Sequence, residues 1–303
     1  MNKSLFADIS LLFVALVWGS TFVLVQNALS FLEPFSFNGV RFFLAGLLLF
    51  GWLCLFQRHQ FTYINKRLIF SGMFIGFWLF LGYAFQTLGL LYTTSSKAGF
   101  ITGLSVVIVP FLSYILLKQR PNILAIVGVF IATIGLYLLT MTDSASLNVG
   151  DAFVFICAAG FALHIIFIGK FSKQFPTLLL TAIQILTVAF LSSIFAFLFE
   201  DWEDAFRTDV LLTGEVIVAL VITSIFATAV AFFIQTNFQK YTKPTRVALI
   251  FATEPVFAAA TGYFWAGDRL SGSAIFGCLL ILFGMIFAEL PKKNMLFQRK
   301  NAM

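Results

Sequence analysis

Charged side chains are scarce in this sequence. Only 11% of its 303 residues are charged, whereas 60% are hydrophobic and the mean hydropathy is +0.99. In a soluble globular protein about 25% of the residues are charged. This composition therefore excludes an ordinary soluble protein and indicates a membrane protein. The net charge of +6 does not indicate a nucleic-acid partner, because the basic residues lie in short loops between apolar segments.

Histidines, cysteines and catalytic motifs are also rare or missing. The two histidines form no HExxH zinc motif, and the chain has neither a GxSxG motif nor a GxxxxGK[ST] nucleotide-binding loop. Cys54, Cys157 and Cys278 each lie within an apolar run and share no spacing, so we interpret them as small buried hydrophobic residues. The sequence therefore predicts no catalytic residue, no metal, no cofactor and no direct use of ATP.

Ten apolar runs are long enough to cross a bilayer, which takes about 20 residues. The first run is too long for a cleaved signal peptide, so we expect it to be retained as a helix. The connections are short, and the longest polar ones cannot fold alone. The sequence thus predicts an all-α, polytopic membrane protein with ten transmembrane helices. The runs are 8–29, 35–56, 68–90, 97–117, 122–141, 150–170, 177–199, 211–237, 243–266 and 272–290.

Lysine and arginine gather on one side of the predicted membrane. Ten helices place fifteen basic residues on the side of both termini, and only Lys97, Arg207 and Arg269 on the other. Loops rich in lysine and arginine stay in the cytoplasm. We therefore expect an integral protein of a bacterial plasma membrane with both termini cytoplasmic. The fifteen are Lys3, Arg58, Lys66, Arg67, Lys118, Arg120, Lys170, Lys173, Lys240, Lys243, Arg246, Lys292, Lys293, Arg299 and Lys300.

The sequence consists of two copies of one five-helix unit. The later part of each copy repeats after 149 residues and the front after 143, so the second and third helices of a copy are joined by connections that differ by six residues. At the longer shift the matches are Gln86-Thr87 with Gln235-Thr236, Tyr92-Thr93 with Tyr241-Thr242, Lys97 with Arg246, Arg120 with Arg269, Gly128 with Gly277, and Gly135 with Gly284. At the shorter shift they are Asp8 with Asp151, Trp18 with Phe161, and Arg41 with Gln184.

These copies define two domains of one membrane unit. We divide the chain into residues 1–141 and 142–303, the second ending in a short basic cytoplasmic tail. Because five is an odd number, the second copy enters the membrane in the opposite orientation, which gives two inverted five-helix repeats. Inverted repeats are typical of secondary transporters, since two nearly equivalent halves can exchange inward-open and outward-open shapes.

Five segments also occur in a characteristic order. They are ALVWGSTF (15–22), NGVRFFLAGLLL (38–49), VPFLSYILLKQRP (109–121), TEPVFAAATGYFWAGDRL (253–270) and the last run with Gly277 and Gly284. In this order they resemble the drug/metabolite transporter superfamily, in its ten-helix branch with two EamA-type repeats. The resemblance covers nearly the whole chain. It implies a central cavity between the halves and transport of small metabolites, often export of amino acids or related compounds.

The chain departs from this family at one position. The family commonly has an acid before the arginine that ends the fourth helix, and Gln119 stands there, whereas Asp268 keeps the acid in the second copy. This difference argues against a symmetric ion pair at both ends of the cavity.

The function that follows is alternating-access transport, and the resemblance implies that its direction is export. The expected partners are a small-molecule substrate, the lipid bilayer and protons as a candidate coupling ion, while the oligomeric state stays open. The alternative is a cation or multidrug efflux transporter. That chemistry favours an acid deep in the first helix of a repeat, where this chain has only Asp8 near the end. A membrane-embedded enzyme is a further alternative, but its motifs are missing.

Polar and aromatic residues within the spans are candidates for the substrate cavity. Trp18 and Trp78 lie near the middles of their spans, where they either stack on a substrate or pack within the protein. Polar stripes in a membrane helix either face a wet cavity or hold helices together. His164 is either a cavity residue or a satisfied hydrogen-bonding group. The cavity candidates are Trp18, Thr21, Trp78, Gln86, His164, Ser224, Thr228 and Gln235.

Two charged residues lie well inside the predicted spans. A carboxylate at mid-membrane costs a few kcal/mol. Glu254 is therefore either a protonatable group that couples or binds, or a residue that shapes the helix break at Pro255. Arg41 either binds a substrate carboxylate, or reaches outward, or pairs with Glu33 or a backbone carbonyl.

Lys97 and Arg246 occupy matching helix starts on opposite sides of the membrane. They act either as interfacial anchors or as parts of a latch for each gate, with Asp268 and Arg269 outside and Arg120 and Arg246 inside. We also expect close helix packing at four glycines, Gly99, Gly103, Gly277 and Gly284.

Overall fold

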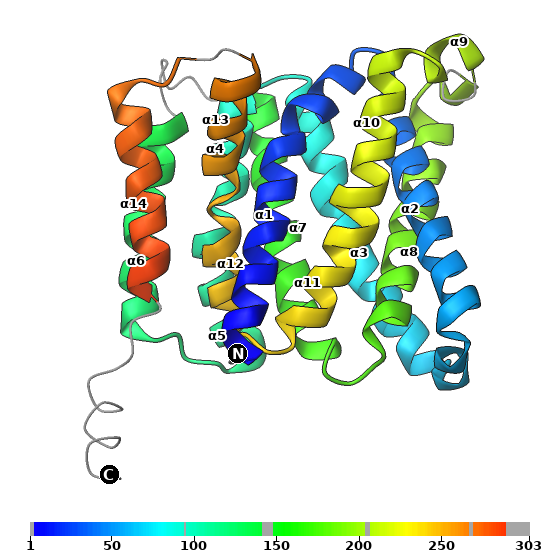
Figure 1. Ribbon diagram of the computed structural model, residues 1–303, viewed down its shortest axis with the longest axis horizontal. Helices are drawn as coiled ribbons and strands as arrows, with labels where there is room; N and C mark the ends of the chain where they lie inside the picture. The colour runs from blue at the N-terminus through cyan, green and yellow to red at the C-terminus, as the bar shows by residue number, and fades with distance from the viewer. Residues whose placement is uncertain (1–2, 94, 141–147, 204–206, 267–268, 289–303) are drawn as a thin grey trace.

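The computed structural model describes residues 3–93, 95–140, 148–203, 207–266 and 269–288. These ranges contain no strand, and their long helices run side by side in one bundle (Figure 1). Nine described spans are long and apolar enough to cross a membrane, and α14 is a shorter apolar helix. The prediction of an all-α, ten-helix membrane protein is confirmed. Seven spans are single helices: α1 (Lys3–Ala28), α2 (Pro34–Phe56), α3 (Lys66–Leu90), α6 (Ile123–Thr140), α7 (Val149–Phe171), α8 (Thr177–Phe199) and α14 (Gly272–Ala288).

Several helices begin at residues that favour a helix N-terminus. In lipid every backbone polar group must be satisfied within the protein, so apolar runs of this length fold as helices. Pro34 stands in the first turn of α2, where its missing N–H costs nothing. The Asn65 side chain accepts a hydrogen bond of 2.9 Å from the Leu68 N–H at the start of α3. Two short segments, η1 (Arg58–Tyr63) and α9 (Thr208–Leu211), lie in the connections.

Three spans are interrupted. One consists of α4 (Ser95–Gly103) and α5 (Ser105–Leu117), and its mate consists of α12 (Pro244–Phe251), α13 (Glu254–Thr261) and the π-helical segment η4 (Gly262–Ala266). Their breaks, at Leu104 and at Ala252–Thr253, fall at matching positions of the two copies. Pro255 accounts for the second break, because it has no N–H to donate. The third interrupted span is α10 (Gly214–Ser224), the π-helical η3 (Ile225–Val230) and α11 (Ala231–Gln239).

The two copies pack against each other rather than folding separately. Helix α2 packs on α8 and α6 on α14, and each of these two pairs joins matching helices of the two copies. Helix α3 packs on α7, which joins the third helix of one copy to the first helix of the other. Helix α1 lies along α10 to α13, and α7 lies along α3 to α5. Both large hydrophobic clusters accordingly contain side chains from both copies. The core of each half is therefore incomplete without the other half.

Glycines set the crossing of α6 and α14, which stand side by side at one edge of Figure 1. A Cβ on Gly128 would lie 2.5 Å from the Gly284 carbonyl, and one on Gly135 would lie 2.6 Å from the Gly277 carbonyl. Gly277 and Gly284 thus allow close packing, as expected. The expectation for Gly99 is wrong, because no atom lies within 4 Å of the place of its Cβ. Gly103 is intermediate, with Leu136 at 3.0 Å.

The bundle has two faces that differ in charge. We call the end where α1 begins the basic face, because the basic residues Lys66, Lys118, Lys170 and Lys240 lie at or just beyond the helix ends there. At the opposite face the Glu200 carboxylate accepts hydrogen bonds of 2.7 Å from the N–H groups of Phe35 and Ser36, at the start of α2. Burial raises the pKa of Glu200, and these hydrogen bonds oppose that rise.

Candidate functional site

A cavity of about 590 Å³ lies in the middle of the bundle. Its walls come mainly from α1, α3, α4, α7, α11 and α13. Gln26, Arg269 and Ser271 line it at the opposite face, where they are exposed, and the buried residues Phe232 and Phe251 line it deep in the bundle. None of its described lining residues lies in a connection at the basic face. The cavity is therefore open toward the opposite face.

Two helix pairs show why the cavity opens at this end. On the basic side α5 packs against α12, which closes the bundle there. On the other side α4 and α13 stand on different walls of the cavity, where Gly99 and Thr102 line it from α4 and Ala258 and Ala259 from α13. Gly19 lets α13 approach α1, because a Cβ at this glycine would lie 2.9 Å from the Ala258 nitrogen. The two matching breaks, at Leu104 and at Ala252–Thr253, lie beside the cavity, because the residues that flank them line it.

Aromatic rings form the deep part of the cavity. The rings of Trp18 and Phe251 lie 5.0 Å apart between centroids, and Trp18 and Phe232 lie 5.2 Å apart. The Trp18 indole Nε1–H donates a hydrogen bond of 2.8 Å to the Ala227 carbonyl, which fixes the ring. Tyr83 lies 5.3 Å from Phe161 across the same space. These rings make a rigid apolar surface suited to a flat or apolar part of a ligand.

Arg41 places a buried cation in the wall of the cavity. Arg41 is 3% exposed, and its Nε donates a hydrogen bond of 2.8 Å to the Thr228 hydroxyl. The guanidinium lies 5.0 Å from the centre of the Tyr83 ring. No described carboxylate forms an ion pair with it, and Glu33 instead accepts a hydrogen bond from the Asp201 N–H. The other expected partner, a backbone carbonyl, is present, because Arg41 Nη2 donates a hydrogen bond of 3.5 Å to the Ala227 oxygen. A buried charge without a counter-charge is costly. The site therefore favours an anionic group on a ligand.

Glu254 places a carboxylate in another wall. It is the first residue of α13, directly after the break, and it lines the cavity with Pro255. In the described part of the chain no hydrogen bond or ion pair holds its side chain. Since an ionised carboxylate inside a membrane protein pairs or faces a functional cavity, Glu254 favours a cationic group or a proton at this position.

Amides and an imidazole also line the cavity. His164 is 2% exposed, and its Nε2 lies 3.0 Å from the Gln184 Oε1. Gln235 donates 3.3 Å to the Gln239 Oε1, and Gln239 in turn donates to the Ile165 carbonyl. The series of hydrogen bonds ends at the Ile165 carbonyl, because a carbonyl only accepts. At its other end the Gln235 Oε1 is an acceptor that is buried without a hydrogen-bond partner among the described residues.

The cavity gathers most of the residues expected there, but not all. Thr21 and Gln86 line it together with Trp18, His164 and Gln235. Three expected residues lie elsewhere. Trp78 packs against Phe74 and Phe77, Ser224 is buried outside the cavity, and Thr228 lies behind Arg41 and accepts its hydrogen bond.

The coupling and gating candidates are spread over the molecule. Glu254 and Arg41 lie in the cavity, and Arg269 lies at its mouth. Lys97 forms an ion pair of 2.7 Å with Asp151, and Arg246 forms one of 2.5 Å with Asp8. The latch that includes Arg120 and Arg269 stays a prediction. Asp268 lies outside the described residues.

Sequence reasoning missed the aromatic wall. Tyr83, Phe161, Phe232 and Phe251 all line the cavity. A usable signal was present, because Phe161 is the match of Trp18 at the shift of 143 residues and Phe232 is the match of Tyr83 at the shift of 149. Moving the candidate Trp18 through the repeat would have named Phe161, which is one of the four rings.

Comparisons with known proteins point to one class. A model described as the EamA-like transporter family matches residues 5–141 and again residues 148–289. An Archaeoglobus fulgidus relative named "Uncharacterized transporter" is 37% identical over 289 residues, which cover 95% of this chain and 87% of the relative. "Uncharacterized transporter YoaV" of Bacillus subtilis is 21% identical over 277 residues, covering 90% of this chain and 92% of its own.

Two further matches bear on fold and on part of the chain. A protein of known crystal structure matches with a TM-score of 0.76 at 21% identity, covering 93% of this chain and 96% of its own, which shows a shared fold. The S-adenosylmethionine/S-adenosylhomocysteine transporter of Chlamydia muridarum is 33% identical over 105 residues, which cover 35% of this chain and 33% of that protein.

Proposed function

The chain belongs to the EamA-like transporter family, and on this basis we propose that it is a secondary transporter that exports a small zwitterionic metabolite. The substrate class is an amino acid or a related compound. One observation supports this class above others: Arg41 and Glu254, the buried cation and the carboxylate of the cavity, line it from different helices with aromatic rings around them. The substrate carboxylate binds Arg41, its ammonium binds Glu254, and its side chain packs on the rings.

The direction of opening fits an alternating-access cycle. The basic face is cytoplasmic by the positive-inside rule, which places both termini in the cytoplasm of a bacterial cell. The cavity is then open outward, and the contact of α5 with α12 closes the cytoplasmic side. The repeats 1–141 and 142–303 exchange conformations to open that side, after which substrate enters from the cytoplasm.

A named relative is compatible with this substrate class. S-adenosylmethionine and S-adenosylhomocysteine both contain an amino-acid group with a carboxylate and an ammonium, and a relative named as their transporter matches part of this chain. The shared chemistry is this zwitterionic end. A larger substrate would place its remaining part along the aromatic wall.

A cation or multidrug exporter is the second candidate. Glu254 beside aromatic rings favours this function, because aromatic faces and a carboxylate bind cations. Arg41 in the same cavity opposes it, since a buried cation repels a second one. Analogues that remove one charge of the substrate separate the two functions.

The test uses purified protein in proteoliposomes and counterflow of radiolabelled amino acids, first in pools and then singly. For each amino acid that is transported, its methyl ester is tested as a substrate with only the cation, and its N-acetyl derivative as one with only the anion. We expect both analogues to be transported at least tenfold more slowly. Faster transport of the ester, together with efflux of cationic dyes, would favour the second candidate. Failure of the whole amino-acid panel would overturn the proposed substrate class.

Proton coupling through Glu254 is a separate part of the proposal. An acid that binds a proton in one state and substrate in the other links the two movements. Uptake into proteoliposomes with an imposed pH gradient should follow the gradient in the wild type and lose this dependence in Glu254→Gln. Glu215→Gln is a matched control, because Glu215 is exposed at the start of α10. Equal pH dependence in Glu254→Gln and the wild type would remove this coupling.

A further inference from the structure

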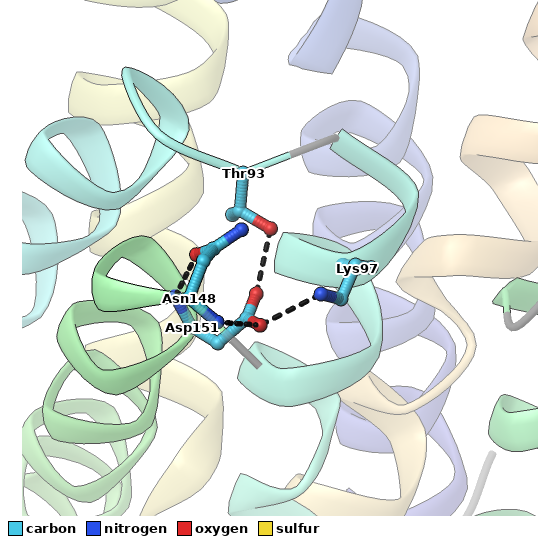
Figure 2. A network of polar contacts seen from close by, with 4 residues as sticks. All are labelled: Thr93, Lys97, Asn148 and Asp151. Atoms are coloured by element: carbon cyan, nitrogen blue, oxygen red, sulfur yellow. Dashed lines mark hydrogen bonds and ion pairs between the residues drawn. The ribbon is translucent and has the colours of Figure 1, made fainter. Parts of the chain in front are cut away.

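A network around Asp151 fastens the start of α7 to α4 at the opposite face. The Thr93 hydroxyl donates a hydrogen bond of 2.6 Å to Asp151 Oδ1, and Lys97 Nζ lies 2.7 Å from Asp151 Oδ2 (Figure 2). The Asn148 N–H also donates to Oδ2 at 3.0 Å, and the Asn148 side chain accepts in return from the Asp151 N–H. Figure 2 shows these groups converging between α7 and the start of α4. We call Thr93, Lys97 and Asp151 the Asp151 network.

The basic face has a matching set with a different arrangement. Asp8 matches Asp151 at the shift of 143 residues, and Arg246 and Thr242 match Lys97 and Thr93 at the shift of 149. The ion pair is present here too, with Arg246 2.5 Å from Asp8. The threonine bond is not: the Thr242 hydroxyl is buried and has no hydrogen-bond partner among the described residues. We call Thr242, Arg246 and Asp8 the Asp8 set.

The two sets therefore share their chemistry and differ in one hydrogen bond. Each joins the first helix of one copy to the interrupted helix of the other copy: α7 to α4, and α1 to α12. The cavity is open at the face where the threonine bond is present and closed at the face where it is absent. A buried hydroxyl without a hydrogen-bond partner raises the free energy of a state. A hydrogen bond from the Thr242 hydroxyl to Asp8 would therefore stabilise a second conformational state.

Inverted repeats determine what that other state is. When the cavity turns to the basic face, each copy takes the conformation that the other copy has in the first state. The Asp8 set then takes the arrangement now seen in the Asp151 network, and the reverse holds at the other face. An ion pair is present in each of the two arrangements, so the exchange leaves the Lys97–Asp151 and Arg246–Asp8 pairs intact. Only the threonine bonds exchange. Asn148 stays out of this exchange, because its match at the shift of 143 is Leu5.

We propose that the Thr93 hydroxyl binds its aspartate while the cavity is open to the opposite face, and that the Thr242 hydroxyl binds its aspartate while the cavity is open to the basic face. The two threonines are positioning residues that stabilise one state each. This inference rests on the alternating access of the proposed function. Loss of one hydrogen bond to an ionised carboxylate shifts the equilibrium between the states by about tenfold or more.

The two states can be read at one matched pair of positions. Gly99 lines the cavity with open space around its Cβ position, so Gly99→Cys is tolerated and reports opening to the opposite face. Its match at the shift of 149 is Ala248, which is 1% exposed on α12, so Ala248→Cys reports opening to the basic face. A membrane-impermeant maleimide is added to one side of sealed vesicles at a time. The native cysteines Cys54, Cys157 and Cys278 are first replaced by alanine.

The test combines these reporters with Thr93→Val and Thr242→Val. Thr93→Val should slow the labelling of the Gly99→Cys reporter and speed that of the Ala248→Cys reporter, and Thr242→Val should do the reverse. The serine variants at both positions keep a hydroxyl and should behave like the wild type. Thr62→Val is the control, because the Thr62 hydroxyl bonds only to the nearby His59 carbonyl in the described structure.

Shifts in the same direction for both valine variants, or no shift in either, would overturn the proposal. Gel filtration identifies a valine variant that does not fold. The test then uses the other threonine alone, by comparing the valine variant at that position with the serine variant at the same position. Amino-acid counterflow measured on the same vesicles reports separately whether the protein transports. Active transport without opposite shifts contradicts the threonine exchange alone, whereas absent transport contradicts the proposed function.

Discussion

The two repeats supply matching aromatic residues to the cavity but different charges. At the shift of 143 residues Trp18 matches Phe161, and at the shift of 149 Tyr83 matches Phe232, and all four line the cavity. The charged residues behave differently. Arg41 matches the neutral Gln184, and Glu254 matches Ser105, which also lines the cavity without a charge.

This difference separates the scaffold of the cavity from its selectivity. A symmetric set of rings keeps a similar surface when the copies exchange conformations, so the walls need not be rebuilt in each state. An asymmetric pair of charges gives the cavity a fixed direction, so that a zwitterion binds with the same end toward Arg41 in both states. Substitutions that make one repeat match the other test this separation.

Arg41→Gln gives the first repeat the residue of the second and should have the largest effect. Loss of the buried guanidinium removes the charge-assisted hydrogen bonds to the substrate carboxylate, so we expect counterflow of the transported amino acid to fall roughly 30-fold or more. The free energy of unfolding should not fall, because an unpaired buried cation is removed. Arg120→Gln, at an exposed position on the basic face, is the control. Undiminished counterflow in Arg41→Gln would show that the carboxylate binds elsewhere.

Glu254→Ser gives the second repeat the residue of the first and should have the next largest effect. The ammonium of the substrate loses its counter-charge, so counterflow of the amino acid should fall about tenfold. Counterflow of the N-acetyl derivative, which has no ammonium, should change little or rise. The ratio of the two rates is the measurement. A parallel loss for both compounds would contradict an ammonium site at Glu254 and would favour a role in shaping the helix break.

Asp151→Asn and Asp8→Asn compare the ends of the molecule through stability. In the Lys97–Asp151 pair the side chains are 16% and 4% exposed, against 33% and 9% in the Arg246–Asp8 pair, so solvent screens the first pair less. Asp151 also accepts from Thr93. We expect Asp151→Asn to lower the free energy of unfolding by about 2 kcal/mol and Asp8→Asn by about 1 kcal/mol. Thermal unfolding in detergent measures both, and a larger loss for Asp8→Asn would reverse the comparison.

Much of the fold followed from the sequence because lipid leaves few choices. Apolar runs of about 20 residues must be helices in a bilayer, and lysine and arginine mark alternate connections. The ends were less certain: the first helix was expected from residue 8 and begins at Lys3. Pro255 predicts one break, whereas no proline or glycine within the π-helical turn Ile225–Val230 predicts the other.

The site was harder to predict, because spacing along a helix defines a face but not the neighbour of that face. Gln86 and Gln235 line the cavity, whereas Trp78, at a helical spacing of eight from Gln86, packs against phenylalanines outside it. Ser224 and Gln235 are eleven residues apart, a spacing that places them on one face of a regular α-helix. The π-helical segment between them changes this register, and of the two only Gln235 lines the cavity. Such a register change is invisible in the residue pattern.

Trp18→Phe makes the two repeats alike in the aromatic wall and should have the smallest effect. The ring surface remains, so counterflow should stay within about twofold of the wild type. The lost indole N–H leaves the Ala227 carbonyl, which accepts it at 2.8 Å, without this donor, so the free energy of unfolding should fall by about 1 kcal/mol. Counterflow and thermal unfolding on the same preparation measure both effects. A loss of counterflow above about tenfold at unchanged stability would mean that the indole itself binds the substrate, and the aromatic wall would then belong to selectivity together with the charges.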